Sequence, residues 1–417
     1  MTRISVEQHR RDVEDLLGSL GGTERRSRPA QVVPLAEALD RVLAADLHAP
    51  VDLPLFRNSQ MDGFAVRAAD VAGAGARTPV TLPVTAEVAA APGRPAALAQ
   101  GSAARIMTGA PVPDGADAVV PVEDTGDGSF SPGAPRPGDP TPHVQVRAAR
   151  VAGEFVRAAG SDVRAGDLLL PAGTVLAPHL LAAAAACGVD RLGVVAPPRV
   201  AVVSTGSELV APGTRPGPGQ VFDANLVALG AAVRRAGGLV VGEHRTGDDA
   251  DELARVLAEA AAASDLVLTS GGVSQGAYEV VKDVLGGAGD VVFRSVAMQP
   301  GGPQGLGRVH GTPILTFPGN PVSAQVSFVV FARDAVTRAA GRVPAPRSRA
   351  VLDGEVSSPA GRRQLLRGVR SGDGTVRVVG GPGSHLVASM ARADVLVDVP
   401  ADVTRRVTGD EVEVWEL

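Results

Sequence analysis

Residues 200–209 read VAVVSTGSEL, residues 266–272 read LVLTSGG, and residues 314–321 read ILTFPGNP. Each stretch is a short apolar run that ends in a loop of small and polar residues. Further apolar runs lie at 239–241 and 291–296. Runs of this length, closed by glycine, proline or polar residues, are typical of buried strands in a parallel sheet.

Segments with helical patterning separate these runs. They cover residues 225–235, 251–263 and 279–285, and a last one follows at 322–340. Alternation of strands and helices predicts a doubly wound α/β domain whose sheet is largely parallel. Domains of this kind bind ligands beyond the carboxyl ends of their strands, so the loops quoted above form the candidate binding site.

The N-terminal part of the chain has a different pattern. Residues 5–20 predict a helix with Ser5 as its N-cap, and residues 34–46 predict a second helix. Residues 144–195 are mixed, with an alanine-rich segment that favours helix.

Two other regions have strand-like patterning. Between residues 47 and 143, short apolar runs alternate with glycine and proline, which predicts a small β domain. After residue 347 similar runs return, and they predict a terminal β-barrel or sandwich.

The composition excludes several classes of protein. The 417 residues carry a formal net charge of −5, which argues against a dedicated nucleic-acid binder. The single cysteine, Cys187, excludes an intramolecular disulfide framework and a cysteine-based zinc site. The charged N-terminus does not resemble a signal peptide, and no apolar run reaches the length of a membrane span. We therefore expect a soluble, cytoplasmic protein.

The loops that follow the apolar runs have the composition of an anion-binding cradle. Glycine lets backbone N–H groups approach an anion, and helix N-termini favour negative charge. Three such loops at one sheet edge predict a ligand that bears phosphate; the alternative is that they are ordinary tight turns. None is a P-loop, and the first loop lacks GxGxxG, which disfavours a dinucleotide fold. The candidate binding residues are Ser204, Thr205, Gly206, Ser270, Gly271, Gly272, Ser274, Pro318, Gly319, Asn320 and Pro321.

Three carboxylates, Glu208, Asp248 and Glu279, accompany the same edge. Acidic residues beside a phosphate site are electrostatically reasonable if a divalent cation bridges the two. The alternative is that they cap helices and face solvent. Asp249 and Asp251 fit that second role, because acidic residues favour the first turn of a helix.

Seven motifs spread along the chain resemble one family. In these motifs, which occur in family order and span nearly the whole chain, the sequence is similar to the molybdopterin molybdenumtransferases. These are the molybdenum-insertion enzymes of molybdenum-cofactor synthesis, and the E domain of gephyrin resembles them. The motifs are QMDGFA (60–65), RIMTGAPVPDGADAVVPVE (105–123), GSDVRAGD (160–167), STGSEL (204–209), TSGGVSQGAYE (269–279), FPGNPVSA (317–324) and GSHLVASM (383–390).

The resemblance implies four domains. An elongated helical domain I takes residues 1–46 and 144–195, and a β-rich domain II takes residues 47–143. Domain III, at 196–343, is the α/β domain that binds molybdopterin, and the C-terminal β-barrel, domain IV, takes residues 344–417. The family is a homodimer in which each active cleft is formed by domain III of one subunit and domains I and II of the other.

The resemblance also implies the reaction. Molybdenum from molybdate enters the dithiolene of adenylylated molybdopterin, and AMP is released, with a divalent cation such as Mg²⁺. Cleavage of a phosphoanhydride develops charge on phosphate oxygens, which a metal and a backbone cradle would stabilise. Carried over by motif, the catalytic residues are Asp62, Thr108, Asp162, Glu208, Asp248 and Glu279, with Asp248 and Glu279 at the metal, while Arg157 and Arg367 match the cleft arginines.

One segment departs from the family pattern. Many members carry lysines where this chain has Ser295, Gln299 and Gly302, and none of these replacements is charged. Two interpretations stay open. Either Arg294 supplies the charge while Gln299 and Gln304 donate hydrogen bonds, or the chain is a paralogue with weakened affinity for molybdate. We include Arg294, Ser295 and Gln299 among the candidate substrate-binding residues.

Two other functions fit parts of the sequence. A nucleotide hydrolase with a related α/β domain would share the SGG loop but would lack QMDGFA and RIMTGAP. A degenerate paralogue acting as a molybdopterin-binding or scaffold protein is the other, but the chain offers no scaffold feature beyond dimerisation.

Overall fold

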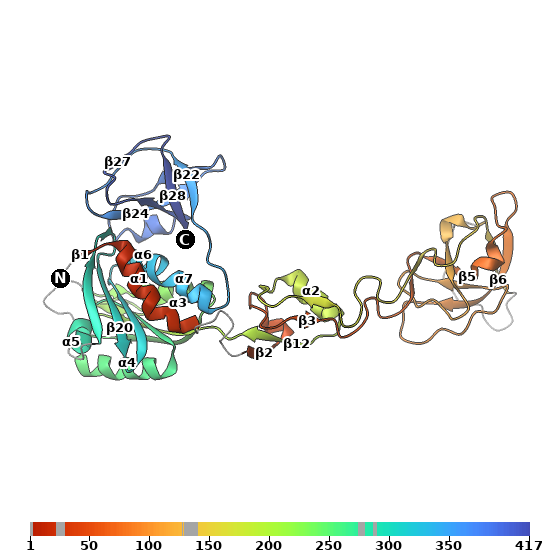
Figure 1. Ribbon diagram of the computed structural model, residues 1–417, viewed down its shortest axis with the longest axis horizontal. Coiled ribbons are helices and arrows are strands. Elements are labelled where there is room, and N and C mark those ends of the chain that lie inside the picture. The colour runs from red at the N-terminus through yellow and green to blue at the C-terminus, as the bar shows by residue number, and fades with distance from the viewer. Residues whose placement is uncertain (1–2, 22–29, 127, 129–140, 274–279, 287–289) are drawn as a thin grey trace.

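The computed structural model describes residues 3–21, 30–126, 128, 141–273, 280–286 and 290–417. The chain is elongated (Figure 1). An α/β domain and a C-terminal β domain lie together at one end, a small module lies in the middle, and an inserted β domain forms the other end.

The α/β domain is built on a seven-stranded sheet of order β1-β18-β20-β21-β17-β13-β16. The parallel strands β13 (Arg199–Thr205), β17 (Leu266–Ser270) and β21 (Thr312–Phe317) lie inside it and are almost wholly buried, as their apolar runs predict. The sequence analysis did not predict β20, which runs antiparallel to both neighbours and makes the sheet mixed. The remaining strands are β1 (Arg3–Ile4), β16 (Leu239–Thr246), β18 (Val291–Val296) and β20 (Pro303–Val309).

Helices cover both faces of this sheet. One face carries α4 (Ala250–Ala263) and α5 (Val280–Gly286). The other face carries α1 (Val6–Leu17), α3 (Ala224–Arg235), α6 (Pro321–Ser327), η5 (Phe328–Ala332) and α7 (Arg333–Ala339).

Two helices can be compared with the sequence-based expectations. Asp249 caps α4, as expected, by accepting the N–H of Glu252 at 2.9 Å. The helix expected at 322–340 is interrupted by η5, which is a π-helical segment.

The first helix packs in the α/β domain and not in a separate helical domain. Its expected N-cap is present, because Ser5 Oγ accepts the N–H of Gln8 at 3.1 Å. Val13 and Leu17 are buried in the core that α6, η5 and α7 share, and β1 pairs in parallel with β18. Residues 1–46, which the sequence analysis grouped as one segment of domain I, are therefore divided between two parts of the structure.

The middle module contains less helix than expected. The helix predicted at 34–46 is wrong: only Leu35–Glu37 forms a 3-10 turn, and Asp40 has a φ of 60°. Val42 and Leu43 instead bridge to other segments of the module, which draws the chain into an extended path. The module consists of β2 (Ala30–Pro34) paired with β12 (Arg191–Val195), β3 (Leu47–His48) paired with β11 (Leu168–Leu170), and α2 (Pro178–Ala186).

Two β domains complete the chain. The inserted domain has the strand order β8-β5-β7-β6-β9. In the C-terminal domain the strands β24-β25-β22-β28-β26 form a ring that the pairing of β24 with β26 closes, so the expected barrel is confirmed. The bounds are β5 (Gly63–Val66), β6 (Val80–Val88), β7 (Ala103–Ile106), β8 (Ala118–Pro121), β9 (His143–Val146), β22 (Ser348–Leu352), β24 (Arg363–Arg370), β25 (Thr375–Val378), β26 (Val395–Val399) and β28 (Glu411–Glu416). Within the ranges that the structure describes, no helix has the length and apolarity needed to span a membrane.

The contact between α1 and η5 contains a buried histidine. His9 is 1% exposed, and its ring meets that of Phe331 edge to face at a centroid distance of 4.6 Å. The pKa of His9 is lowered to about 4, chiefly by burial and also by the nearby Arg294 guanidinium, while Asp12 opposes the shift. His9 is therefore neutral in the folded protein at neutral pH.

We predict that acid weakens the fold through this residue. Between pH 6.5 and 4 the unfolded chain binds a proton at His9 that the folded chain does not bind, so stability falls as the pH is lowered through this range. The shift from the usual value corresponds to about 3 kcal/mol by pH 4. Denaturant titrations at a series of pH values should show a smaller loss for His9→Leu than for the wild type. Equal losses in both proteins would contradict this account.

Candidate active site

The carboxyl ends of β13, β17 and β21 meet at one edge of the sheet, where their loops touch. The N–H of Gly271 donates to the carbonyl of Phe317 at 3.1 Å, which ties the loop after β17 to the end of β21. Gly271 has a φ of 99°, and a Cβ at this position would lie 2.4 Å from the carbonyl oxygen of Thr205. Only glycine fits between these loops. The structure therefore brings together the three loops that the sequence analysis selected.

The three loops surround a pocket of about 400 Å³, here called the strand-end pocket. Ser204 and Ser270 are buried beneath it, with their hydroxyl oxygens 3.3 Å apart, and do not line it. Ser274 lies outside the described residues. The predicted residues that line the pocket are Thr205, Gly206, Glu208, Asp248, Gly271, Gly272, Pro318, Gly319, Asn320 and Pro321.

Two further residues of this pocket escaped the sequence analysis. Asn225 donates from Nδ2 to the carbonyl of Gly319 at 2.7 Å, and its buried Oδ1 has no hydrogen-bond partner among the described residues. Asp223 caps α3 and accepts hydrogen bonds from Ser204 Oγ at 3.1 Å and from Arg245 Nε at 3.0 Å. The sequence carried one signal that could have identified these two residues: an Asp and an Asn lie at the start of a predicted helix, where polar side chains serve as caps.

The strand-end pocket is acidic. Glu208, Asp248 and Asp223 line it, and no lysine or arginine lines it within the described ranges. Asp248 is held in place by Ser207, whose Oγ accepts the N–H of Asp248 at 3.1 Å and whose N–H donates to the Asp248 carboxylate at 3.4 Å. The described residues contain no group of three or more His, Cys, Asp or Glu side chains placed to hold a metal ion. Glu279, the other predicted metal ligand, lies outside them.

A second pocket, of about 440 Å³, adjoins the first at Pro318 and Asn320, which line both. It lies between residues 295–303 of the α/β domain and Arg362 and residues 382–385 of the C-terminal domain, and is here called the barrel pocket. The short strand β19 (Met298–Gln299) pairs in parallel with β24, which brings the C-terminal domain against this wall.

The uncharged residues at the lysine positions share the barrel pocket. Ser295, Gln299 and Gly302 all line it. Gln364 donates from Nε2 to Oε1 of Gln299 at 3.1 Å, so Nε2 of Gln299 is the amide group left to donate to a ligand. Gln304 does not line the pocket: it is buried, and its Nε2 donates to Gly301 and to a serine hydroxyl of α6. The expectation that Gln304 donates to an oxyanion is wrong, because the amide holds the turn instead.

Arg294 also lies outside both pockets. Successive residues of a strand point to opposite faces of the sheet. Because Ser295 faces the barrel pocket, Arg294 faces α1, where its guanidinium pairs with the carboxylate of Asp12. In this structure Arg294 thus lies at α1 and does not line either pocket, so its role in anion binding stays a prediction.

The arginine predicted to lie near the cleft in the C-terminal domain, Arg367, is buried and holds a loop. Arg367 is 1% exposed, and its guanidinium donates to the carbonyls of Gly381 and Gly383. It therefore shapes the loop that walls the barrel pocket and does not face the cavity. Arg362, which the sequence analysis did not select, is the arginine of this strand region that lines the pocket.

The remaining predicted residues lie in a different part of the chain. Asp62 Oδ1 accepts hydrogen bonds from the N–H and Oγ1 of Thr108, at 2.7 and 2.9 Å, and these bonds lower the pKa of Asp62. Arg157 donates to Asn58 Oδ1 at 3.5 Å, and Asp162 is exposed nearby in sequence. The strand β5 that follows Asp62 is at the far end of the molecule from the α/β domain (Figure 1). One chain therefore does not bring these residues to the strand-end pocket.

Comparison with protein families covers all parts of the chain. Residues 4–188 match the MoeA N-terminal region (domains I and II), residues 201–338 match a probable molybdopterin-binding domain, and residues 349–417 match the MoeA C-terminal region (domain IV).

Individual relatives agree with these matches. Molybdopterin molybdenumtransferase 2 of Mycobacterium tuberculosis is 45% identical over 99% of both chains. Molybdopterin molybdenumtransferase 1 of the same organism is 35% identical over 97% of this chain and 98% of its own. The crystal structure of the molybdopterin biosynthesis MoeA protein from Pyrococcus horikoshii superposes with a TM-score of 0.77 at 31% identity, over 99% of this chain and 98% of that one.

We predict that Arg294 contributes to stability through α1. A partly exposed ion pair of this kind is worth about 0.5–1 kcal/mol. A double-mutant cycle of Arg294→Ala with Asp12→Ala, measured by denaturant unfolding, should give a coupling energy of that size. Arg215→Ala, at an exposed arginine outside α1, should show no coupling to Asp12→Ala. A coupling of zero for Arg294 would contradict its assignment to the helix.

Proposed function

The chain belongs to the MoeA family of molybdopterin molybdenumtransferases, and we propose that its two adjoining pockets divide the substrates of that reaction between them. The enzyme inserts molybdenum from molybdate into adenylylated molybdopterin and releases AMP. In the proposal the strand-end pocket holds the phosphoanhydride and the barrel pocket holds molybdate.

The observation that carries this proposal is the shared wall of the two pockets. Pro318 and Asn320 line both, so ligands in the two cavities are neighbours. The strand-end pocket offers backbone N–H groups at strand ends and the N-terminus of α3, which suit phosphate. The barrel pocket offers hydroxyl and amide donors from Ser295, Gln299 and Asn320, which suit a small oxyanion.

The strand-end pocket also fits a divalent cation. Its charged side chains are all carboxylates, which are hard oxygen ligands, and an anionic phosphate beside them needs a positive charge. Mg²⁺ is usually held by one or two carboxylates together with substrate phosphates. We assign Asp248 and Glu208 to this role, with Glu279 as the expected further ligand. The cation would neutralise charge that develops on the phosphate oxygens.

The chain's own groups then bind and orient. Asn225 and Gly271 fix the two loops that flank the phosphoanhydride. The buried Oδ1 of Asn225, which has no partner within the described ranges, would accept a hydrogen bond from the substrate. Holding the phosphate and the oxyanion in adjacent cavities replaces a chance encounter by a fixed geometry, which lowers the entropic part of the barrier.

We further propose that the active cleft is completed by a second copy of the chain. Asp62, Thr108, Arg157 and Asp162 belong to the cleft by family motif, and β5, which directly follows Asp62, lies at the other end of the chain from the α/β domain (Figure 1). A homodimer that sets the inserted domain of one subunit against the α/β domain of the other would unite them. Exposed apolar side chains are present at both places, with Phe56 48% exposed beside this cluster in sequence and Phe222 49% exposed in the pocket wall.

The competing functions are weaker. A nucleotide hydrolase would not require the inserted and C-terminal domains, which both match MoeA regions. A pure scaffold would not require the glycine cradle. We also propose that the enzyme works in the cytoplasm, where the biosynthetic chemistry of its relatives is expected.

The function is tested with purified protein, adenylylated molybdopterin and molybdate. AMP release and the appearance of molybdenum-loaded cofactor should both occur and should depend on molybdate. Expression in a strain deficient in molybdenum insertion should restore molybdoenzyme activity. Failure of both assays would refute the proposed function.

We predict that Asp248→Asn slows AMP release about 100-fold, because loss of the carboxylate weakens the cation site by about 3 kcal/mol. The concentration of Mg²⁺ needed for half-maximal rate should also rise. Asp251→Asn removes an exposed carboxylate of α4 near the same loop and should leave both quantities unchanged. Wild-type kinetics in Asp248→Asn would exclude the metal role of this residue.

We predict that subunit mixing restores activity. Asp62→Ala and Glu208→Ala should each be inactive as homodimers. An equal mixture with free subunit exchange should regain about a quarter of wild-type activity, because half of the dimers are mixed and each has one intact cleft. A mixture of Asp62→Ala with Thr108→Ala is the matched control, because both changes lie on the same side of the cleft and should give no recovery. Absence of recovery in the first mixture, with exchange verified, would argue against a shared cleft.

A further inference from the structure

In the proposed function the barrel pocket binds a dianion, molybdate. Ser295, Gln299 and Gly302 carry no charge, and Arg294 is turned toward α1. Two arginines line this pocket in the described structure, Arg362 from the C-terminal domain and Arg3 from the N-terminal strand. Arg3 belongs to no motif that the sequence analysis selected, yet it lies at the pocket.

The placement of Arg3 follows from strand pairing. β1 pairs in parallel with the edge strand β18, with Arg3 opposite Ser295 and Ile4 opposite Val296. Residues paired in this way share a face of the sheet, and faces alternate along each strand. Ile4 packs against the core that contains Val296, Arg3 shares the other face with Ser295, and Arg3, Ser295 and Val296 all line the barrel pocket. The N-terminal strand thus places the guanidinium of Arg3 beside Ser295 in the wall of the barrel pocket.

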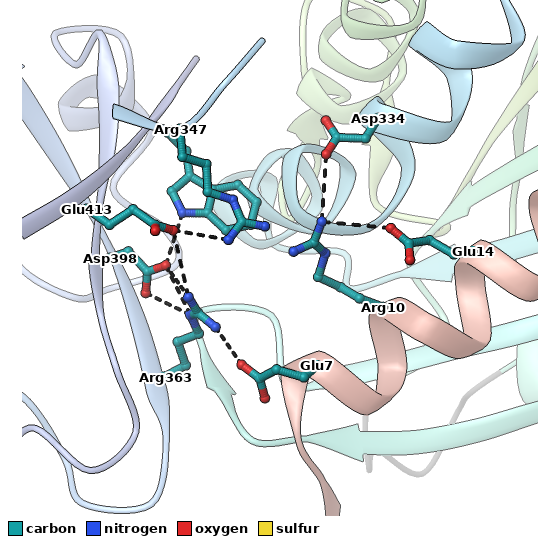
Figure 2. Close-up of polar contacts among 9 residues, drawn as sticks. Glu7, Arg10, Glu14, Asp334, Arg347, Arg363, Asp398 and Glu413 are labelled. Atoms are coloured by element: carbon teal, nitrogen blue, oxygen red, sulfur yellow. Dashed lines mark hydrogen bonds and ion pairs between the residues drawn. The ribbon is translucent and has the colours of Figure 1, made fainter. Parts of the chain in front are cut away.

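The segment that carries Arg3 is braced against the C-terminal domain (Figure 2). Glu7, in the first turn of α1, pairs with Arg363, and Arg363 Nε donates to both oxygens of Asp398 at 2.7 and 3.0 Å. Asp398 is 2% exposed and also accepts Trp415 Nε1 at 3.0 Å. Arg363 directly follows Arg362, and Arg363 pairs with Met298 of β19.

A second ion pair joins the same helix to the α/β domain. Asp12 of α1 binds Arg294, which precedes Ser295 in β18. α1 is therefore tied on two sides, to the strand that forms one wall of the barrel pocket and to the domain that forms the other. This bracing limits the freedom of β1, so less conformational entropy is lost when Arg3 engages an anion.

We propose that Arg3 is an affinity-determining residue for the molybdate oxyanion, and that its guanidinium supplies charge which the lysine positions of this chain no longer provide. The inference rests on the proposed function and deepens it. Guanidinium donates charge-assisted hydrogen bonds to tetrahedral oxyanions, whereas the serine and glutamine of this pocket donate neutral ones.

The test compares molybdate dependence in Arg3 variants. Arg3→Gln should raise the molybdate concentration for half-maximal insertion about tenfold or more, with the rate at saturating molybdate within about twofold of wild type. Arg3→Lys should restore most of the lost affinity, because it keeps the charge. Molybdate binding to the protein without pterin, measured by equilibrium dialysis, should weaken in the same order.

Controls separate a local effect from a general one. Arg11→Gln removes the same charge from an exposed position of α1 and should leave molybdate dependence unchanged. Thermal midpoints of both Arg3 variants should match the wild type, because β1 pairs through its backbone. Two results would overturn the inference: unchanged molybdate dependence in Arg3→Gln, or an equal shift in Arg11→Gln. In either case wild-type insertion would leave the proposed function standing, whereas a wild-type protein that neither releases AMP nor loads molybdenum would refute that function itself.

Discussion

The approach of Gly271 to the carbonyls of Thr205 and Phe317 is the contact on which the rest of the site depends. Parallel strands deliver their loops to one edge of a sheet, but the loops form a cradle only if their backbones can touch. A Cβ at Gly271 would collide with the neighbouring loop, so the strands could not end so closely together. Asn225 then locks the third loop from α3. Glycines of the three loops line the resulting cavity together with the carboxylates Glu208, Asp223 and Asp248, and under the proposed function a cation would offset the charge of these carboxylates beside an anionic phosphate.

Elongation divides the chemistry between two ends of the chain. The α/β and C-terminal domains, whose residues line the strand-end and barrel pockets, lie at one end, and β5, which directly follows Asp62, lies at the other (Figure 1). The middle module, with its short paired strands, acts as a spacer between them. If the cleft is shared between subunits as proposed, the dimer is a requirement of the reaction and not merely a means of added stability.

The N-terminal segment contacts both the α/β domain and the C-terminal barrel domain. α1 packs its apolar side in the core of the α/β domain, while its first turn reaches Arg363 in the barrel domain (Figure 2). The ion pairs at Glu7 and Asp12 are each modest, because their partners are partly exposed. Their effect lies in orientation: they fix the two walls of the barrel pocket relative to each other, and β1 places Arg3 between those walls.

The amino-acid sequence by itself determined the domain types and the loops of the cradle, because buried parallel strands leave unbroken apolar runs and tight loops leave glycine and proline. It also determined the caps at Ser5 and Asp249, which are local interactions. It did not determine the antiparallel strand β20, the extended path of residues 34–46, or the roles of Arg3, Arg294 and Arg367. Those depend on which segments pair and which face of a strand meets a neighbour, and these choices are made by contacts between separate segments of the chain, such as that of Arg294 with Asp12. Tertiary structure alone therefore decided which arginines line the barrel pocket and which ones pair with its supporting elements.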